Sequence, residues 1–165
     1  PWLVTLVDTG ENTDTGGRLK RVREFLGKNT FCFTYGDGLS DINISQLIEF
    51  HENHSGIATI TAVKPPGRFG ALVVDPQKKV ELFREKPDGD GSWINGGFFV
   101  LDSDVLDLIE DDFIKWENEP LETLALQKKL YAYEHEGFWH PMDTLRDKRY
   151  LETLWEKNNP PWKMW

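Results

Sequence analysis

Apolar residues recur along the chain at two different spacings, and each spacing predicts a different element. Runs of β-branched and aromatic residues favour strands, whereas apolar residues three or four positions apart favour helices. The runs that predict strands are residues 3–7, 30–35, 57–63, 71–74, 80–83, 93–101 and 130–135. Helical spacing is found in residues 18–26, 44–51, 104–109, 121–128 and 145–155. Strands and helices therefore alternate in the first half of the chain, and a hairpin is expected in the middle.

This order of elements predicts an α/β fold with a mixed, mainly parallel sheet. With 165 residues and neither an internal repeat nor a linker, the chain is expected to form a single domain over residues 1–165. Ser40 and Asp41 are residue types that favour the N-cap of the helix expected at 44–51. Pro1 leads directly into an apolar run, which leaves open that the chain is a fragment of a longer protein.

The composition argues against several classes of protein. Apolar residues make up 39% and aromatic residues 13% of the chain, which argues against disorder. The net charge of −9 argues against unaided binding to nucleic acid or to an anionic membrane. No stretch approaches the roughly 20 apolar residues of a membrane span. The single cysteine, Cys32, lies in an apolar run, so we expect a buried thiol, no internal disulfide and a reducing, cytoplasmic setting.

The segment FCFTYGDGLSD, residues 31–41, ends an apolar strand in one acidic residue between two glycines. Its aromatic first half is typical of a strand that is buried on both faces. Ligands of parallel α/β sheets bind at the carboxyl ends of strands, where Gly36 and Gly38 would let a phosphate approach the backbone. Asp37 is then suited to Mg²⁺, which takes one or two carboxylates together with substrate phosphates and water. A plain β-turn explains the same spacing equally well.

A second acidic residue, Asp143, follows an aromatic run in the loop GFWHPMDT. It is a candidate second metal ligand if this loop lies beside Asp37. Asp143 is also placed to be the N-cap of the helix that begins near Leu145, and taken alone this interpretation is the stronger one. Spacing does not show whether the two acids meet in space.

Two loops near the middle of the chain combine charge with glycine or proline. In FREKPDGDG, the Glu85 carboxylate is suited to accept hydrogen bonds from vicinal sugar hydroxyls, and the Lys86 ammonium is suited to a phosphate. The alternative is an exposed salt pair at the end of a strand. In PPGRFG, Arg68 would hold an anion and Gly70 leaves space for a ligand, whereas the alternative is a surface turn.

Two further segments place glycines next to polar side chains. In INGG, Asn95 can donate and accept hydrogen bonds, as sugar recognition requires, and Gly96 permits close approach; a β-bulge is the alternative. In DTGGR, the glycines before a helix would present free N–H groups to a ligand, and Thr15 would hold a base or ribose edge. A glycine-rich helix start explains Gly16 and Gly17 equally well. The phosphate loop GxxxxGK[ST] is absent from the sequence.

The order of these segments is more informative than any one of them. The chain resembles the sugar-1-phosphate nucleotidyltransferases over essentially all 165 residues, through TGGRLKRV, FTYGDGLSDI, PPGRFGAL, FREKPDGDGSWINGGFFVL and GFWHPMDTLRDKRYLETLWEK. The segments PPGRFGAL, INGGFFVL and WHPMDTLRDK resemble the cytidylyl branch of that family. The resemblance implies a Rossmann-like nucleotidyltransferase fold and Mg²⁺-dependent transfer of a cytidylyl group from CTP to α-D-glucose 1-phosphate, with release of pyrophosphate. It also implies a homo-oligomer, by family a hexamer.

The resemblance further implies a role for each candidate residue. Asp37 and Asp143 resemble the paired Mg²⁺ ligands. Lys86 resembles the cation beside the sugar phosphate, and Glu85 the acceptor of the glucose hydroxyls. The positions that resemble the family's sugar pocket are Gly70, Asn95 and Gly96. Those that resemble the nucleotide side are Thr15, Gly16 and Arg18, with Tyr35 and Gly36 as the floor beneath.

The sequence departs from the family pattern in one respect. The family opens with a strand, a GGxGTR loop that cradles the triphosphate and a downstream lysine, and this sequence contains no such stretch. We therefore expect the N-terminal units of the fold to be missing and the chain alone to be inactive.

Three other functions stay open from the sequence. An enzyme specific for UTP or dTTP would share most of these segments. A non-catalytic sugar-phosphate-binding module is a second alternative, although a degenerate copy is expected to lose some of the four residues Asp37, Glu85, Lys86 and Asp143. A metal-dependent glycosyltransferase is the third, because DGD at 88–90 matches an Asp-x-Asp pattern, but this match lies in a polar loop.

Overall fold

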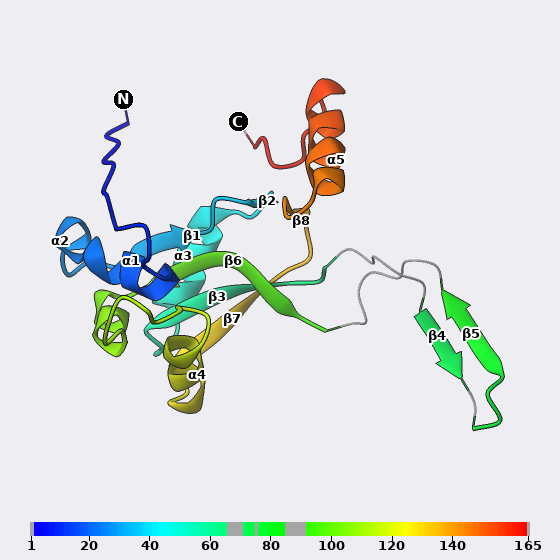
Figure 1. Cartoon of the computed structure of the whole chain (residues 1–165), viewed down its shortest axis with the longest axis horizontal. Coiled ribbons are helices and arrows are strands. Elements are labelled where there is room, and N and C mark those ends of the chain that lie inside the picture. The colour runs from blue at the N-terminus through cyan, green and yellow to red at the C-terminus, as the bar shows by residue number, and fades with distance from the viewer. Residues whose placement is uncertain (1, 66–70, 75, 85–91, 165) are drawn as a thin grey trace. The chain divides into compact units, whose positions relative to one another are not determined.

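The computed structural model describes residues 2–65, 71–74, 76–84 and 92–164, with the backbone alone for 71–74, 83 and 84. Figure 1 labels the α-helices and the strands. The helices are α1 (Thr15–Arg21), α2 (Arg23–Leu26), α3 (Ile44–Glu52), the 3₁₀-helix η1 (Ser103–Leu108), α4 (Glu119–Leu126) and α5 (Leu145–Glu156). The strands are β1 (Phe31–Thr34), β2 (Gly38–Ser40), β3 (Ala58–Val63), β4 (Ala71–Val74), β5 (Val80–Arg84), β6 (Ile94–Leu101), β7 (Leu130–His135) and β8 (Trp139–Pro141). The α/β class predicted from the sequence is confirmed.

Four strands form the main sheet, in the order β1-β6-β3-β7. The chain divides into two compact units: unit 1 comprises residues 1–33, 48–60 and 99–132, and unit 2 comprises residues 34–47, 61–98 and 133–165. Strands β1, β3 and β7 run from unit 1 into unit 2, whereas β6 runs the opposite way. The sheet is therefore mixed, as predicted, whereas the expectation that it is mainly parallel stays a prediction. The single domain over residues 1–165 stays a prediction.

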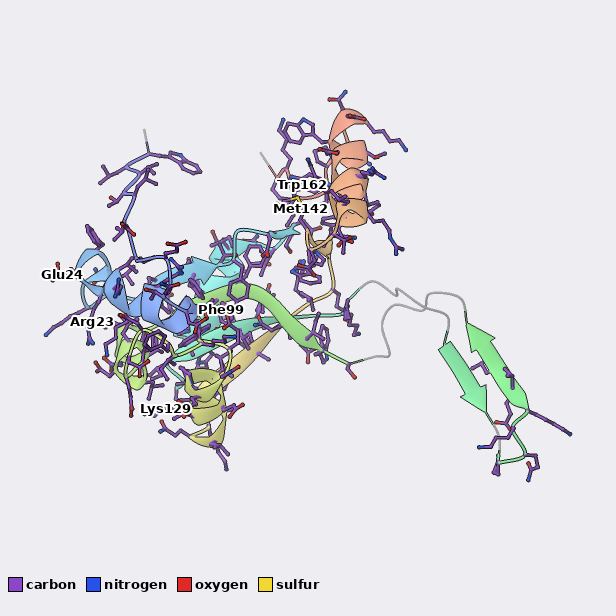
Figure 2. All side chains as sticks on the ribbon, viewed as in Figure 1. Arg23, Glu24, Phe99, Lys129, Met142 and Trp162 are labelled. Atoms are coloured by element: carbon purple, nitrogen blue, oxygen red, sulfur yellow. The ribbon has the colours of Figure 1, made fainter. Side chains whose placement is uncertain are left out.

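Unit 1 has a core of aromatic and aliphatic side chains. Phe99 on β6, labelled in Figure 2, stacks on Phe33 with 5.5 Å between ring centroids, and Trp116 packs edge-on against both rings. Phe99 and Trp116 are 1% and 0% exposed. The other buried apolar side chains of unit 1 are Leu19, Ala58, Val100, Leu101, Val105, Leu106, Ile109, Leu121 and Leu124. Full burial of one such Leu, Val or Phe side chain stabilises the fold by roughly 1.5–3 kcal/mol, which makes this core the main support of unit 1.

Unit 1 also contains a hydrogen-bond network in which polar groups follow one another from Gly56 to Asp102. The Gly56 N–H donates to His54 Nδ1 at 3.0 Å, so His54 Nε2 carries the proton and donates to Thr59 Oγ1 at 2.7 Å. Thr59 Oγ1 lies 2.9 Å from His51 Nδ1, and His51 Nε2 lies 3.3 Å from Asp102 Oδ1. Burial, helped by the neighbouring His51, lowers the pKa of His54. This hydrogen-bond network requires a neutral His54, because a protonated Nδ1 would face the Gly56 N–H as a second donor.

Unit 2 contains two short antiparallel pairs. Strands β4 and β5 form the hairpin predicted from the sequence. Strands β2 and β8, three residues each, pair so that Gly38 lies opposite Pro141 and Ser40 lies opposite Trp139. Neither β2 nor β8 was expected from the sequence, because a three-residue segment is too short to show a period.

Two predictions about the first two apolar runs of the chain are wrong. Residues 3–7 form no strand, and the side chains of Leu3 and Leu6 are 95% and 92% exposed. An apolar pattern alone does not make a strand, because the backbone needs a neighbour to pair with. The second error concerns β1, which is partly buried at Phe31 and Phe33 but exposed at Cys32, so the thiol is not a core residue.

The N-cap of helix α3 lies later in the sequence than predicted. The Asn43 Oδ1 atom accepts a hydrogen bond from the Gln46 N–H at 3.1 Å, so Asn43 caps α3. Ser40 ends β2, and its hydroxyl donates to the Phe138 carbonyl at 2.9 Å. The predicted cap at Ser40 and Asp41 is therefore wrong. Among the helices that the structure describes, none has the length and apolar character needed to cross a bilayer.

Candidate active site

The β2–β8 pair brings the two candidate acids of unit 2 to one cavity. Asp37 precedes β2 and Asp143 follows β8, so both extend from the same end of the antiparallel ladder. The N–H of Met142, labelled in Figure 2, donates to the Asp37 carbonyl at 2.8 Å and continues the pairing. Asp37 and Asp143 are both exposed, and both line a cavity of about 230 Å³. Two acids far apart in the sequence therefore share one site.

The other walls of this cavity come from three segments of the same unit. They are the end of β1, the start of β6 and the strand β8. The lining residues are Thr34, Tyr35, Asp37, Gly38, Asn95, Gly96, Gly97, Trp139, Pro141 and Asp143. Six residues singled out from the sequence are thus brought together: Tyr35, Asp37, Gly38, Asn95, Gly96 and Asp143. An open hollow with two carboxylates and a carboxamide is suited to a polar ligand with a bound cation.

Asp143 is not the cap of α5. The Thr144 hydroxyl accepts a hydrogen bond from the Asp147 N–H at 3.2 Å, and Asp147 Oδ2 accepts one from the Thr144 N–H at 3.0 Å. This reciprocal pair is a capping box, with Thr144 as the N-cap. The capping interpretation of Asp143 is therefore wrong.

The amide of Asn95 is oriented by its own strand. Asn95 Oδ1 accepts a hydrogen bond from the Gly97 N–H at 2.8 Å, and Asn95 Nδ2 lies 3.4 Å from the Tyr35 hydroxyl. Gly97 has a φ of 78°, and a Cβ there would lie 2.6 Å from the Tyr35 ring. The sequence suggested that Asn95 both donates and accepts, and the amide here makes one hydrogen bond of each kind. Because a carboxamide has two N–H donors and two lone pairs, Asn95 keeps the capacity to donate to a ligand in the cavity.

Gly36, the residue before Asp37, lies in open surroundings. A Cβ on Gly36 would meet no atom of the described residues within 4 Å, and its φ is not in the left-handed region. Neither packing among the described residues nor backbone conformation therefore requires glycine at position 36. Close approach of a ligand is a reason that remains.

Trp139 is a lining residue that sequence reasoning missed. Its indole Nε1–H donates to the Gly96 carbonyl at 2.7 Å and so joins β8 to β6. The available signal was the aromatic run before Asp143, which indicated a packed loop but not which ring faces the site.

The glycine-rich segment of unit 1 differs from its prediction. The N–H groups of Gly16 and Gly17 both donate to the Ile114 carbonyl, at 3.0 and 3.3 Å, so they are not free to meet a ligand. A Cβ on Gly16 would lie 2.6 Å from that same oxygen, so close packing requires glycine there. The Thr15 hydroxyl donates to Glu117 at 2.6 Å and accepts from the Trp116 N–H. The alternative explanation, a glycine-rich helix start, fits this segment.

Arg18 is held by the polar loop before α1. Its guanidinium donates to Thr9 Oγ1 at 2.7 Å and to the Glu11 carbonyl at 3.1 Å, and both contacts are exposed. The roles of Thr15, Gly16 and Arg18 on a nucleotide side stay predictions. Four other candidates, Arg68, Gly70, Glu85 and Lys86, lie outside the described residues.

The acid pair fits a magnesium ion held partly by substrate. Among residues 2–65, 76–82 and 92–164, no group of three or more His, Cys, Asp or Glu side chains is placed to hold a metal. Mg²⁺ does not need such a group, because it is commonly bound by one or two carboxylates together with phosphate oxygens and water. Two exposed carboxylates in an open cavity meet that requirement. The site does not resemble a zinc site, because Asp37 and Asp143 offer oxygen ligands alone.

Comparisons with known proteins identify the family of the chain. The nucleotidyl transferase family matches residues 4–147. Two relatives named glucose-1-phosphate cytidylyltransferase, from Salmonella typhi and Salmonella typhimurium, are each 60% identical over the whole chain. A probable glucose-1-phosphate cytidylyltransferase from Bacillus subtilis is 38% identical over 99% of the chain. The chain spans 64% of the length of each of these relatives.

Solved structures support the fold. A protein described as a glucose-1-phosphate thymidylyltransferase from Bacillus anthracis superposes with a TM-score of 0.64, over 88% of this chain and 62% of that one, at 18% identity. HddC from Yersinia pseudotuberculosis superposes with a TM-score of 0.58, over 85% of this chain and 61% of that one, at 20% identity. At these identities the likeness concerns the fold alone. Because the family match extends over most of the sequence, the chain belongs to the nucleotidyl transferase family.

Proposed function

We propose that this protein transfers the cytidylyl group of CTP to α-D-glucose 1-phosphate and releases pyrophosphate. The single observation that carries the proposal is the meeting of Asp37 and Asp143 at one cavity beside Asn95 and Gly96. The choice of CTP and of glucose 1-phosphate is supported by the names of the relatives that are 60% identical to the chain.

The reaction needs alignment of two anions rather than covalent catalysis. A phosphate oxygen of the sugar phosphate attacks the α-phosphorus of CTP, the bond from that phosphorus to the bridging oxygen breaks, and pyrophosphate leaves. The main barrier is the repulsion between the phosphates, so the protein must hold them in line and offset their charge. The net charge of −9 is compatible with this because the cations are needed locally.

Asp37 and Asp143 would hold the cation in this proposal, and we assign it to Mg²⁺. When bound, Mg²⁺ offsets negative charge on the phosphates. Asn95 would donate to an oxygen of the sugar, and the absence of a side chain at Gly36 would leave room for the ligand.

The remaining roles rest on the sequence pattern. In the same proposal, Glu85 accepts hydrogen bonds from glucose hydroxyls, Lys86 offsets the charge of the sugar phosphate and Gly70 leaves space at the sugar. Tyr35 contacts the nucleotide in this proposal, and the resemblance implies a nucleotide role for Thr15, Gly16 and Arg18 as well. We further propose a homo-oligomer, by family a hexamer, that works in the cytoplasm, where CTP is available.

The test is pyrophosphate release with Mg²⁺, glucose 1-phosphate and each of CTP, UTP, dTTP, ATP and GTP. It uses the chain alone and a chimaera in which the chain replaces the segment that it matches in the Salmonella typhi relative. We expect release by the chimaera with CTP, loss of release in its Asp37→Asn variant, and no release by the chain alone.

A matched control replaces a carboxylate of the same unit that lies on α5. Glu152 forms an exposed ion pair with Lys148, so Glu152→Gln should leave the rate unchanged. Release with UTP or dTTP in place of CTP would change the nucleotide. A folded chimaera that releases no pyrophosphate with any nucleotide would favour a sugar-phosphate-binding module.

A further inference from the structure

We propose that Trp139 is a positioning residue: its indole N–H joins the strand pair that carries Asp37 and Asp143 to the strand that carries Asn95. The inference deepens the proposed function, because it rests on the two acids holding one cation. All of these residues belong to unit 2.

The strand pair that carries the acids is small. Strands β2 and β8 have three residues each and pair with one another in a two-stranded sheet. An isolated two-stranded pair is marginally stable in water, so its position depends on contacts made by its side chains. The distance between the acids and the opposite wall of the cavity is therefore not fixed by the ladder itself.

The hydrogen bond of Trp139 reaches a wall that is tightly packed. Its acceptor, the Gly96 carbonyl, belongs to β6, and the 2.7 Å separation indicates a well-made bond. Gly96 is buried, and a Cβ there would lie 2.8 Å from Val63 Cγ1 and 3.1 Å from the Thr61 carbonyl. The backbone at Gly96 therefore has little room to move. Because indole can only donate, this bond uses the whole polar capacity of Trp139.

Trp139 also contributes to the walls of two cavities of unit 2. It lines the cavity of the acids and a second cavity of about 410 Å³ that includes Lys64, His135 and Tyr150. A smaller side chain at 139 would therefore remove the hydrogen bond and change both walls.

The experiment measures binding of Mn²⁺ alone to the chain, from the electron paramagnetic resonance signal of the free ion. Mn²⁺ favours the same oxygen ligands as Mg²⁺. Trp139→Phe keeps an aromatic ring at position 139 but removes the indole N–H. We expect it to weaken Mn²⁺ binding about threefold to tenfold, as the loss of one hydrogen bond allows. Trp139→Ala should weaken binding further.

A matched control makes the same chemical change elsewhere in the unit. Trp155 on α5 is 55% exposed and lies under the Lys163 ammonium, so Trp155→Phe should bind Mn²⁺ like the unchanged chain. Thermal melting accompanies each titration, because a purely structural role of Trp139 would lower the melting temperature without changing Mn²⁺ affinity well below it.

The Asp37→Asn variant separates failure of this inference from failure of the proposed function. If Asp37→Asn binds Mn²⁺ weakly and Trp139→Phe binds Mn²⁺ like the unchanged chain, Trp139 does not position the acids. The assignment of Asp37 as a metal ligand then stands. If Asp37→Asn binds Mn²⁺ as well as the unchanged chain does, or if neither of these two proteins binds Mn²⁺, the metal assignment fails. The inference about Trp139 then fails with it. Weak binding by both variants, with Trp155→Phe unchanged, is the expected result.

Discussion

The two units of this chain differ in how much of their apolar surface is buried and in which residues line a cavity. Among the side chains that the structure describes, unit 1 contains the larger share of the buried apolar ones, with Phe99, Trp116 and Leu106 at 1% exposure or less. Unit 2 contains two strands of three residues and a cavity with two exposed acids. Stability and chemistry are therefore encoded in different segments. Substitutions in unit 1 should act on folding, and substitutions at the cavity of unit 2 should act on function.

Phe99→Ala should have the largest effect on stability. Phe99 is buried between Phe33 and Trp116, so truncation leaves a cavity in the core of unit 1. We expect the free energy of unfolding to fall by about 3–5 kcal/mol, measured by urea denaturation. Phe113 in the same unit is 71% exposed, so Phe113→Ala should change it by less than about 0.5 kcal/mol. Equal losses in the two variants would mean that Phe99 does not anchor a core.

A pair of glycine substitutions sharpens the contrast. Gly16→Ala in unit 1 would put a Cβ 2.6 Å from the Ile114 carbonyl and should destabilise the chain by about 1–3 kcal/mol. Gly36→Ala in unit 2 meets no described atom within 4 Å and should leave the melting temperature unchanged. In the chimaera, Gly36→Ala should instead raise KM for the sugar phosphate or CTP. A Gly36→Ala enzyme with unchanged kinetics would argue against ligand approach at this position.

The smallest expected effect is a pH dependence of stability in unit 1. The pKa of His54 is lowered in the folded chain, first by burial and then by His51, so the unfolded chain takes up a proton more readily. The contribution of His54 is therefore complete above the ordinary histidine pKa of about 6.5 and is lost as the pH falls below it. Melting temperatures from pH 7.5 to 5.5 should decline.

The control for this pH dependence is His54→Asn, whose Oδ1 can still accept from the Gly56 N–H. This variant should melt with a shallower decline over the same pH range. An identical slope in both proteins would assign the pH dependence to other groups.

Sequence reasoning found both acids but not the element that joins them. Asp37 was identifiable because it ends an apolar run between two glycines, and Asp143 because it follows an aromatic run and lies two residues after Pro141. Their pairing through β2 and β8 was not predictable, since three residues show no period and Pro141 is unusual in a strand. The Trp139 bond to Gly96 depends on that pairing and was hidden for the same reason.

The errors of sequence reasoning share one physical cause. An apolar pattern shows that a segment can be buried, but burial depends on what packs against it. Leu3 and Leu6 carry a strand-like pattern and are exposed, and Cys32 lies on the open face of β1. The glycines before α1 were open to two explanations, and their contacts with Ile114 support packing.

The most direct test of the central claim compares three variants of the chimaera: Asp37→Asn, Asp143→Asn and the double variant. Pyrophosphate release with CTP, glucose 1-phosphate and Mg²⁺ is measured for each, beside Glu152→Gln. If the two acids hold one cation, each single change should lower the rate about a hundredfold or more, and the double change should lower it little further. Single variants with normal rates, or losses that multiply in the double variant, would contradict a shared metal site.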